Sequence, residues 1–148
     1  FHPGDLDYIH SVERISKFSN VISINGGVQL DLMGQENAES IGTRQLSGVG
    51  GQMDFLEGAY RSKGGKGFIC INSSRVTKDG ERKSNILATI PGGSTISAPR
   101  TMIQYVATEY GIASLSGKTL RERAEAMASI AHPDFREELM KYAQENFK

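Results

Sequence analysis

The stretch Ser47-Gly48-Val49-Gly50-Gly51-Gln52-Met53-Asp54-Phe55 has three glycines in four residues. They come directly before an apolar segment of helical character. Glycine adopts positive φ and lets a ligand approach the main chain, and a following helix aims free N–H groups and its dipole at negative charge. The spacing matches neither the Walker phosphate loop nor the dinucleotide fingerprint G-x-G-x-x-G. The stretch therefore predicts an anion-binding loop before a helix, with a simple tight turn as the alternative interpretation.

The segments on both sides of this loop alternate between helical and strand-like patterns. Before the loop, apolar residues at helical spacing predict a helix over residues 8–18, and two strand-like runs over 21–25 and 28–32 predict a β-hairpin that turns at Gly26-Gly27. After the loop, the patterns predict a helix over residues 53–60 and strands over residues 67–72, 85–90, 94–97 and 104–108.

Two further helices are predicted at the C-terminal end. Thr119-Leu120-Arg121-Glu122 has the capping-box pattern, with an apolar stripe behind it, and His132-Pro133 ends that helix. A last helix carries Phe135, Leu139 and Tyr142 on one face. Strands in the middle and helices at both ends predict a layered α/β or α+β arrangement, which we expect to form a single domain over residues 1–148.

Composition narrows the class of protein. The chain has 148 residues, with 17 Lys and Arg against 17 Asp and Glu, so no overall positive charge indicates nucleic-acid binding. No apolar run approaches the roughly 20 residues of a membrane helix, and we expect a cytoplasmic protein. The single cysteine, Cys70, lies in an apolar strand-like run and is predicted to pack in the core.

Five motifs follow one another in a fixed order. They are Gly34–Ser40, the glycine loop with Gln52–Phe55, Thr108–Ala113, Gly117–Ala124 and Ala131–Arg136. Together they closely resemble the C-terminal domain of the acetyl-CoA hydrolase/transferase family, nearest to the 4-hydroxybutyrate and butyryl CoA-transferases. The resemblance runs from about Tyr8 to the chain end. It implies a layered, CoA-transferase-like α/β domain with a central sheet flanked by helices, and an N-terminal half that this chain lacks.

The resemblance also implies the reaction. Relatives move CoA from an acyl-CoA to a carboxylic acid through a glutamyl anhydride and a glutamyl-CoA thioester, and their nucleophilic glutamate lies in the N-terminal half. Gly51 matches the family glycine whose N–H stabilises the oxyanion, and Glu109 matches a glutamate near the nucleophile. We expect these two as catalytic residues, and we expect the chain to be inactive alone. A strand-end surface acid is the alternative for Glu109.

The expected ligand is coenzyme A or acyl-CoA, bound as a substrate, and no tightly bound cofactor or metal is expected. The glycine loop, Ser47, Gly48, Val49, Gly50 and Gly51, is expected to bind its anionic groups. Lys78 matches a family lysine that reaches the cofactor, although Asp79 replaces a family glycine beside it. Several other basic residues lie between Arg61 and Lys83, and a solvated loop is the preferred interpretation for them.

Some interpretations stay open at this stage. His10 stands where relatives have an asparagine that positions the site, and Glu39 is either a site residue or part of a polar turn made by Asn37. Acyl-CoA hydrolysis and a noncatalytic CoA- or nucleotide-binding module are the alternatives to CoA transfer. The expected partners are the N-terminal half of the enzyme, a short-chain carboxylate and further copies of the chain in a homo-oligomer, with no nucleic acid and no membrane.

Overall fold

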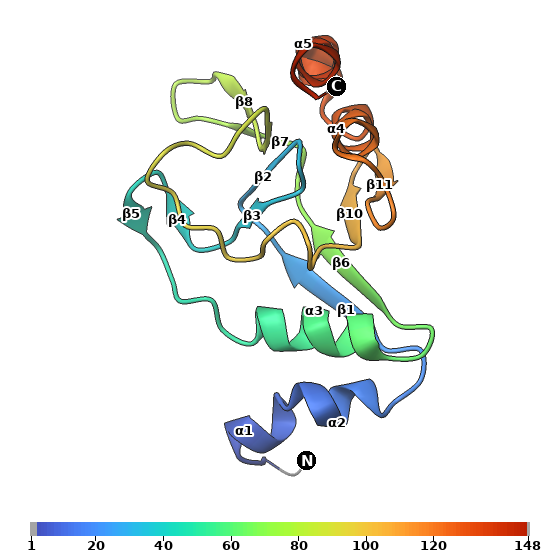
Figure 1. The fold of residues 1–148 in the computed structure, drawn as a ribbon. Helices are drawn as coiled ribbons and strands as arrows, with labels where there is room; N and C mark the ends of the chain where they lie inside the picture. Colours follow the sequence, from blue (N-terminus) through green and yellow to red (C-terminus); the bar gives the residue numbers. More distant parts are fainter. Residues whose placement is uncertain (1–2, 148) are drawn as a thin grey trace.

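The computed structural model describes residues 3–147, with helices at both ends of the chain and sheets between them (Figure 1). The helix predicted over residues 8–18 is instead two short helices, α1 (Leu6–Ile9) and α2 (Val12–Ser16). The prediction is wrong because the Ser11 hydroxyl oxygen accepts the N–H of Arg14 and caps α2 as a new helix. The helix predicted over residues 53–60 is confirmed as α3 (Gln52–Arg61), which packs between α2 and the larger sheet.

The larger sheet consists of three parallel strands and an antiparallel edge strand. Its strands are β1 (Ile22–Gly26), β6 (Lys66–Cys70), β10 (Tyr105–Thr108) and β11 (Gly111–Ser114). They lie in the order β1-β6-β10-β11, and β11 pairs antiparallel with β10. The strands predicted over 67–72 and 104–108 are confirmed, and β11 is an additional strand.

The hairpin predicted at Gly26-Gly27 is wrong. The strand that follows these glycines, β2, leaves the larger sheet and pairs with β3 and β9 in a second sheet. These strands are β2 (Gln29–Asp31), β3 (Glu36–Asn37) and β9 (Ile86–Leu87). A Cβ on Gly27 would lie 2.8 Å from Oε1 of Glu36 and 3.2 Å from Cγ2 of Ile69. Glycine is therefore required by the close approach of the two sheets and not by a turn.

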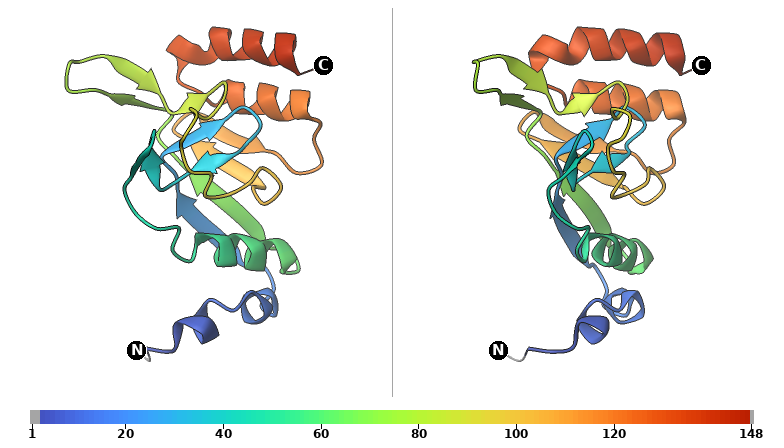
Figure 2. Two further views of the ribbon diagram at one scale, coloured as in Figure 1. Left: turned by 60° about the vertical axis from the view of Figure 1, so that its left-hand side comes forward. Right: turned by 90° about the vertical axis from the view of Figure 1, so that its left-hand side faces the viewer.

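Two short hairpins complete the strands. They are β4 (Ser40–Ile41) with β5 (Arg44–Gln45), and β7 (Ser74–Val76) with β8 (Arg82–Ser84). The β7–β8 hairpin projects from the body of the molecule (Figure 2). Within the predicted strand 85–90 only β9 forms, and the strand predicted over 94–97 is wrong. There the pairing stops at an isolated bridge between Glu36 and Ala98, and the Ser97 hydroxyl donates to the Glu39 carboxylate.

The two C-terminal helices are confirmed as α4 (Leu120–Ser129) and α5 (Pro133–Asn146), which lie side by side in both views of Figure 2. The capping box at Thr119 is present. On α4, the buried Arg123 guanidinium donates to the carbonyl oxygens of Met33 (2.9 Å), Leu115 (2.8 Å) and Arg100 (2.8 Å). This arginine ties three loops to one helix.

The apolar core lies on one face of the larger sheet. Ile69 and Val106 from this sheet, Leu30 from β2, Leu56 from α3 and Met127 from α4 are fully buried in one cluster. The predicted layered α/β arrangement is confirmed. Among residues 3–147, no helix combines the length and the apolar character needed to cross a bilayer.

Candidate active site

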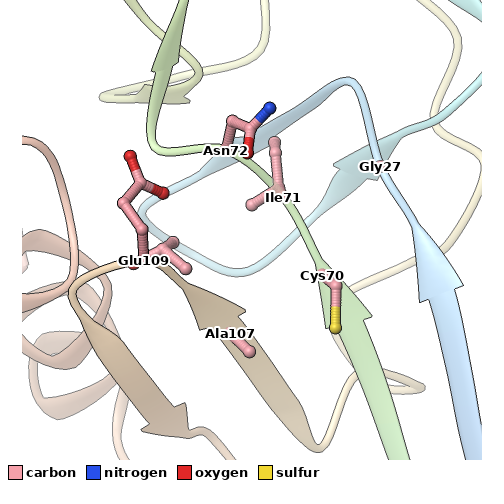
Figure 3. Close-up of a pocket in the computed structure, with 7 residues that line it drawn as sticks. Gly27, Cys70, Ile71, Asn72, Ala107 and Glu109 are labelled. Atoms are coloured by element: carbon pink, nitrogen blue, oxygen red, sulfur yellow. The ribbon is translucent and has the colours of Figure 1, made fainter.

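A cavity of about 430 Å³ opens at the carboxyl ends of β1, β6 and β10 (Figure 3). Ligands of open α/β sheets bind characteristically in the crevice beyond the carboxyl ends of the strands. The residues around this cavity are Gly27, Cys70, Ile71, Asn72, Ala107, Thr108 and Glu109. Figure 3 shows the polar ends of Asn72 and Glu109 beyond the strand ends, where they can meet a ligand.

Glu109 is held at this cavity by Ser73. The Ser73 hydroxyl donates to Oε1 at 2.6 Å, and the Ser73 N–H donates to Oε2 at 2.9 Å. Desolvation acts to raise the pKa of Glu109. The two hydrogen bonds from Ser73 outweigh desolvation and lower this pKa, and the backbone of Glu109 and the charge of His132 lower it further. Glu109 is therefore an ionised acceptor at neutral pH and not a proton donor.

A second cavity of about 220 Å³ adjoins the first and shares Gly27, Ile71 and Asn72 with it. Arg75 and Asn85 also border this cavity, and the Arg75 guanidinium donates to the Asn85 amide oxygen. The Asn85 amide in turn donates to the Asn72 carbonyl at 2.9 Å. A cationic side chain from the β7–β8 hairpin thus lies beside the strand-end cavity.

Lys78 lies in the turn of this hairpin and is exposed. The turn is closed by a hydrogen bond from the Gly80 N–H to the Thr77 carbonyl at 3.0 Å. Within residues 3–147, no acidic side chain pairs with Lys78. Lys78 borders neither of the two cavities. It lies at the far end of the β7–β8 hairpin, which begins directly after Ser73.

The glycine loop is an exposed segment that ends at the N-cap of α3. Gly50 has φ +60, and Gly51 occupies the cap position, so the helix N-terminus follows as predicted. In the described part of the chain, the N–H groups of residues 48–51 have no intramolecular acceptor. The loop therefore presents the donors that an anion needs, but Ser47, Gly48, Val49, Gly50 and Gly51 do not border the cavity at Glu109.

His10 lies directly against Gly51. A Cβ on Gly51 would collide with the imidazole ring. The ring also lies 3.4 Å from Oδ2 of Asp54 through Nδ1, and it makes an edge contact with Phe55 at 5.1 Å between centroids. The side chain at the position where the resemblance leads us to expect an asparagine thus lies against the predicted oxyanion glycine.

A buried carboxyl connects the cavity side of the molecule to the glycine loop. The fully buried Glu36 faces Gly27 through Oε1, and its Oε2 accepts a hydrogen bond from the Gln52 amide at the start of α3. Burial is the main cause that raises the pKa of Glu36 from 4.5 to about 8. The hydrogen bond from Gln52 acts to lower this pKa, and the charge of Glu39 acts to raise it. Glu36 is thus mostly neutral at pH 7, because burial disfavours the charged form of a carboxyl group.

The polar-turn interpretation of Glu39 is also visible in the structure. The Asn37 side-chain oxygen accepts the N–H groups of Glu39 (3.1 Å) and Ser40 (2.9 Å). The Glu39 carboxylate accepts hydrogen bonds from Ser97 and Gln45. Glu39 is therefore buried in a local network and does not border the cavity.

Cys70 corrects the sequence prediction, because it is exposed and borders the cavity instead of packing in the core. Alternation along β6 buries Ile69 on one face and turns Phe68 and Cys70 to the other. That alternation is a readable signal. Ser73 and Glu36 carry no such signal, because their roles depend on partners 36 and 16 residues away.

Comparison with known proteins identifies the class. Residues 2–143 match the acetyl-CoA hydrolase/transferase C-terminal domain, and the chain belongs to this family. It is 49% identical over 142 residues to a 4-hydroxybutyrate coenzyme A transferase of Clostridium kluyveri, and this alignment covers 96% of this chain and 32% of that protein. It is 47% identical over 139 residues to a butyryl-CoA:acetate CoA-transferase of Anaerostipes caccae, and this alignment covers 94% of this chain and 31% of that protein.

The fold agrees with this assignment. The crystal structure of a 4-hydroxybutyrate CoA-transferase from Porphyromonas gingivalis matches with a TM-score of 0.74 at 40% identity, over 95% of this chain and 30% of that chain. The resemblance inferred from the five motifs is confirmed, and the α/β fold is that of a CoA-transferase C-terminal domain. The chain spans about a third of the length of the curated relatives it matches.

Proposed function

We propose that this chain is the part of a CoA-transferase that binds acyl-CoA and completes the active site. The complete enzyme would move CoA from an acyl-CoA to a short-chain carboxylate of the 4-hydroxybutyrate, butyrate or acetate type. The observation that carries the proposal is the ionised Glu109 at the strand-end cavity of a chain from this family. The two relatives described above are named for reactions of the same class.

The nucleophile in this proposal is a glutamate in the N-terminal half, outside this chain. Its carboxylate attacks the acyl-CoA carbonyl, and the C–S bond breaks to give a glutamyl anhydride and the CoA thiolate. The thiolate then attacks the glutamyl carbonyl, which releases the acyl group as a carboxylate and leaves a glutamyl-CoA thioester. The acceptor carboxylate takes the same two steps in reverse, so the new acyl-CoA leaves and the glutamate is regenerated.

The residues of this chain would stabilise the charges that these steps develop. The free N–H groups at Gly51 and before it suit an oxyanion or a phosphate, since fixed donors cost little reorganisation. Glu109, fixed by Ser73, is an acceptor that orients donors and, as an anion, raises the pKa of a neighbouring carboxylate. Lys78 on the hairpin arm is our candidate for a CoA phosphate ligand.

The test uses the complete polypeptide that the gene encodes. After incubation with acetyl-CoA, intact mass and borohydride trapping should place a thioester adduct on a glutamate outside these 148 residues. Glu109→Gln should lower kcat by about 10²-fold, the scale of losing one well-placed polar group. Glu138→Gln, an exposed change on α5, is the matched control. An unmodified protein with no transfer activity would leave only a noncatalytic CoA-binding module.

Hydrolysis is the second candidate, because Glu109 is exposed to solvent in the described chain and the family description includes hydrolases. Water would then replace the acceptor carboxylate in the attack on the thioester. Adding acetate or butyrate separates the two activities. In a transferase these acids accelerate the consumption of acyl-CoA and yield a new acyl-CoA, whereas in a hydrolase they change nothing.

A further inference from the structure

Glu36 is a buried acid that the proposed reaction does not use. It lies on β3, and its side chain is fully buried. Its Oε2 accepts the hydrogen bond from the Gln52 amide, whereas its Oε1 has no hydrogen-bond partner within residues 3–147. A buried polar atom without a partner costs free energy, because it has given up its hydrogen bonds to water. Packing alone therefore does not explain an acid at this position.

The carboxyl group of Glu36 lies at the N-terminus of α3. Gln52, its hydrogen-bond partner, is the first residue of this helix and follows the N-cap Gly51. A helix N-terminus acts as a partial positive charge, and the N–H groups of residues 48–51 have no acceptor within the described chain. One side chain, that of Gln52, thus separates the Glu36 carboxyl from the main chain that carries the proposed anion donors.

The surroundings of Glu36 hold no cation that would compensate a carboxylate. Among residues 3–147, no Lys, Arg or His side chain forms an ion pair with it. Glu39 adds a negative charge nearby and, together with burial, raises the pKa of Glu36. The other acids on neighbouring elements are already paired, since Asp31 of β2 accepts hydrogen bonds within its own turn and Asp54 of α3 lies 3.4 Å from Nδ1 of His10. Every charged group around Glu36 therefore leaves its neutral form favoured.

We propose that Glu36 is a positioning residue whose proton keeps the glycine loop able to stabilise an anion. In its neutral form, Glu36 accepts from Gln52 and fixes the start of α3 without adding charge. A carboxylate at the same place would itself compensate the positive end of the helix and would repel an oxyanion or a phosphate at the loop. The inference rests on the proposed function for the identity of that anion.

The pH profile of CoA transfer by the complete polypeptide tests this role. Glu36→Gln has the shape of the protonated acid but cannot ionise. The ratio of its kcat to the wild-type kcat should rise about tenfold between about pH 6.5 and about pH 9, because only the wild-type enzyme places a negative charge near the developing oxyanion. Glu138→Gln, an exposed change on α5, is the matched control, and its ratio should stay constant. A constant ratio for Glu36→Gln would overturn the inference.

A second variant and a spectrum distinguish a change of charge from a loss of structure. Glu36→Leu is neutral at every pH but cannot accept from Gln52, so its kcat should be lower throughout and yet as independent of pH as that of Glu36→Gln. The far-UV circular dichroism of the wild-type polypeptide should stay unchanged at high pH, and lowering the pH again should restore its activity. Activity that disappears only together with the helical signal would show unfolding and would contradict the proposed role.

Two measurements that need no turnover separate this inference from the proposed function. Infrared spectra of the complete polypeptide in heavy water should show the C=O band of a protonated carboxyl at neutral pH, and Glu36→Gln should lack it. Calorimetric titration with CoA should show that wild-type affinity falls relative to Glu36→Gln as pH rises. If both results hold but no CoA transfer occurs, the inference stands and the proposed function fails. If transfer occurs and the band is missing, the function stands and the inference is overturned.

Discussion

Glu36→Gln replaces a fully buried carboxyl group by an amide of the same shape, and it should remove a pH dependence of stability. The pKa of Glu36 is raised from 4.5 to about 8 in the folded chain, chiefly by burial. The folded state therefore holds a proton that the unfolded state releases above pH 4.5, so stability is present at low pH and falls as pH rises toward 8. With about 1.4 kcal/mol per pKa unit, the loss between pH 5.5 and 8 amounts to about 3 kcal/mol.

Urea unfolding of the 148-residue chain, followed by far-UV circular dichroism across this pH range, measures the effect. The stability of Glu36→Gln relative to the wild-type protein should rise by about 3 kcal/mol as pH increases from 5.5 to 8, because only the wild-type protein loses stability over this range. Glu138→Gln, which removes an exposed carboxylate, should run parallel to the wild-type protein. A constant difference between Glu36→Gln and the wild-type protein would refute a neutral buried Glu36.

Three further changes probe other parts of the structure. Arg123→Met leaves three carbonyl oxygens without their donor and should lower the free energy of unfolding, measured by urea titration, by about 3 kcal/mol or more. Its control is Arg121→Met on the exposed side of α4, which should lower the free energy of unfolding by less than about 1 kcal/mol. Thr119→Ala removes the cap of α4 and should cost about 1 kcal/mol, measured likewise. Lys78→Ala should weaken CoA binding by about threefold to tenfold in calorimetric titrations of the complete polypeptide, with a smaller effect at high salt, while Lys63→Ala should leave CoA affinity unchanged.

Local patterns predicted three of the helices well, failed for the helix over residues 8–18, which is two short helices, and predicted the strand pairings poorly. The capping box at Thr119 and the glycines before Gln52 act within a few residues, so both helix starts could be predicted from the sequence. The hairpin at Gly26-Gly27 failed because strand propensity does not specify the partner. There the deciding contact joins Gly27 to Glu36 and Ile69, and such packing is not encoded in a turn motif.

The candidate site was predictable only in part. The resemblance drew attention to Glu109, which the structure places at the cavity, and to the glycine loop, which it places elsewhere on the described surface. The hydrogen bonds from Ser73 arise from a loop 36 residues away, so no spacing rule predicts them. Lys78 and Gly51 stay predictions, since their roles depend on a bound CoA and on the other part of the enzyme.

The strand β1 is an outer edge of the larger sheet, and its Ile22 and Ile24 side chains are both more than half exposed. An apolar edge strand is a template for pairing with another chain. Domains generally fold in the order of their synthesis, N-terminal first. In a protein built like its relatives, the part that precedes this domain would be made before β1 leaves the ribosome, so the exposed apolar edge would emerge beside a chain that has already begun to fold. A separately expressed C-terminal piece lacks that timing, and we expect the fraction of it that stays in solution to fall as its concentration rises.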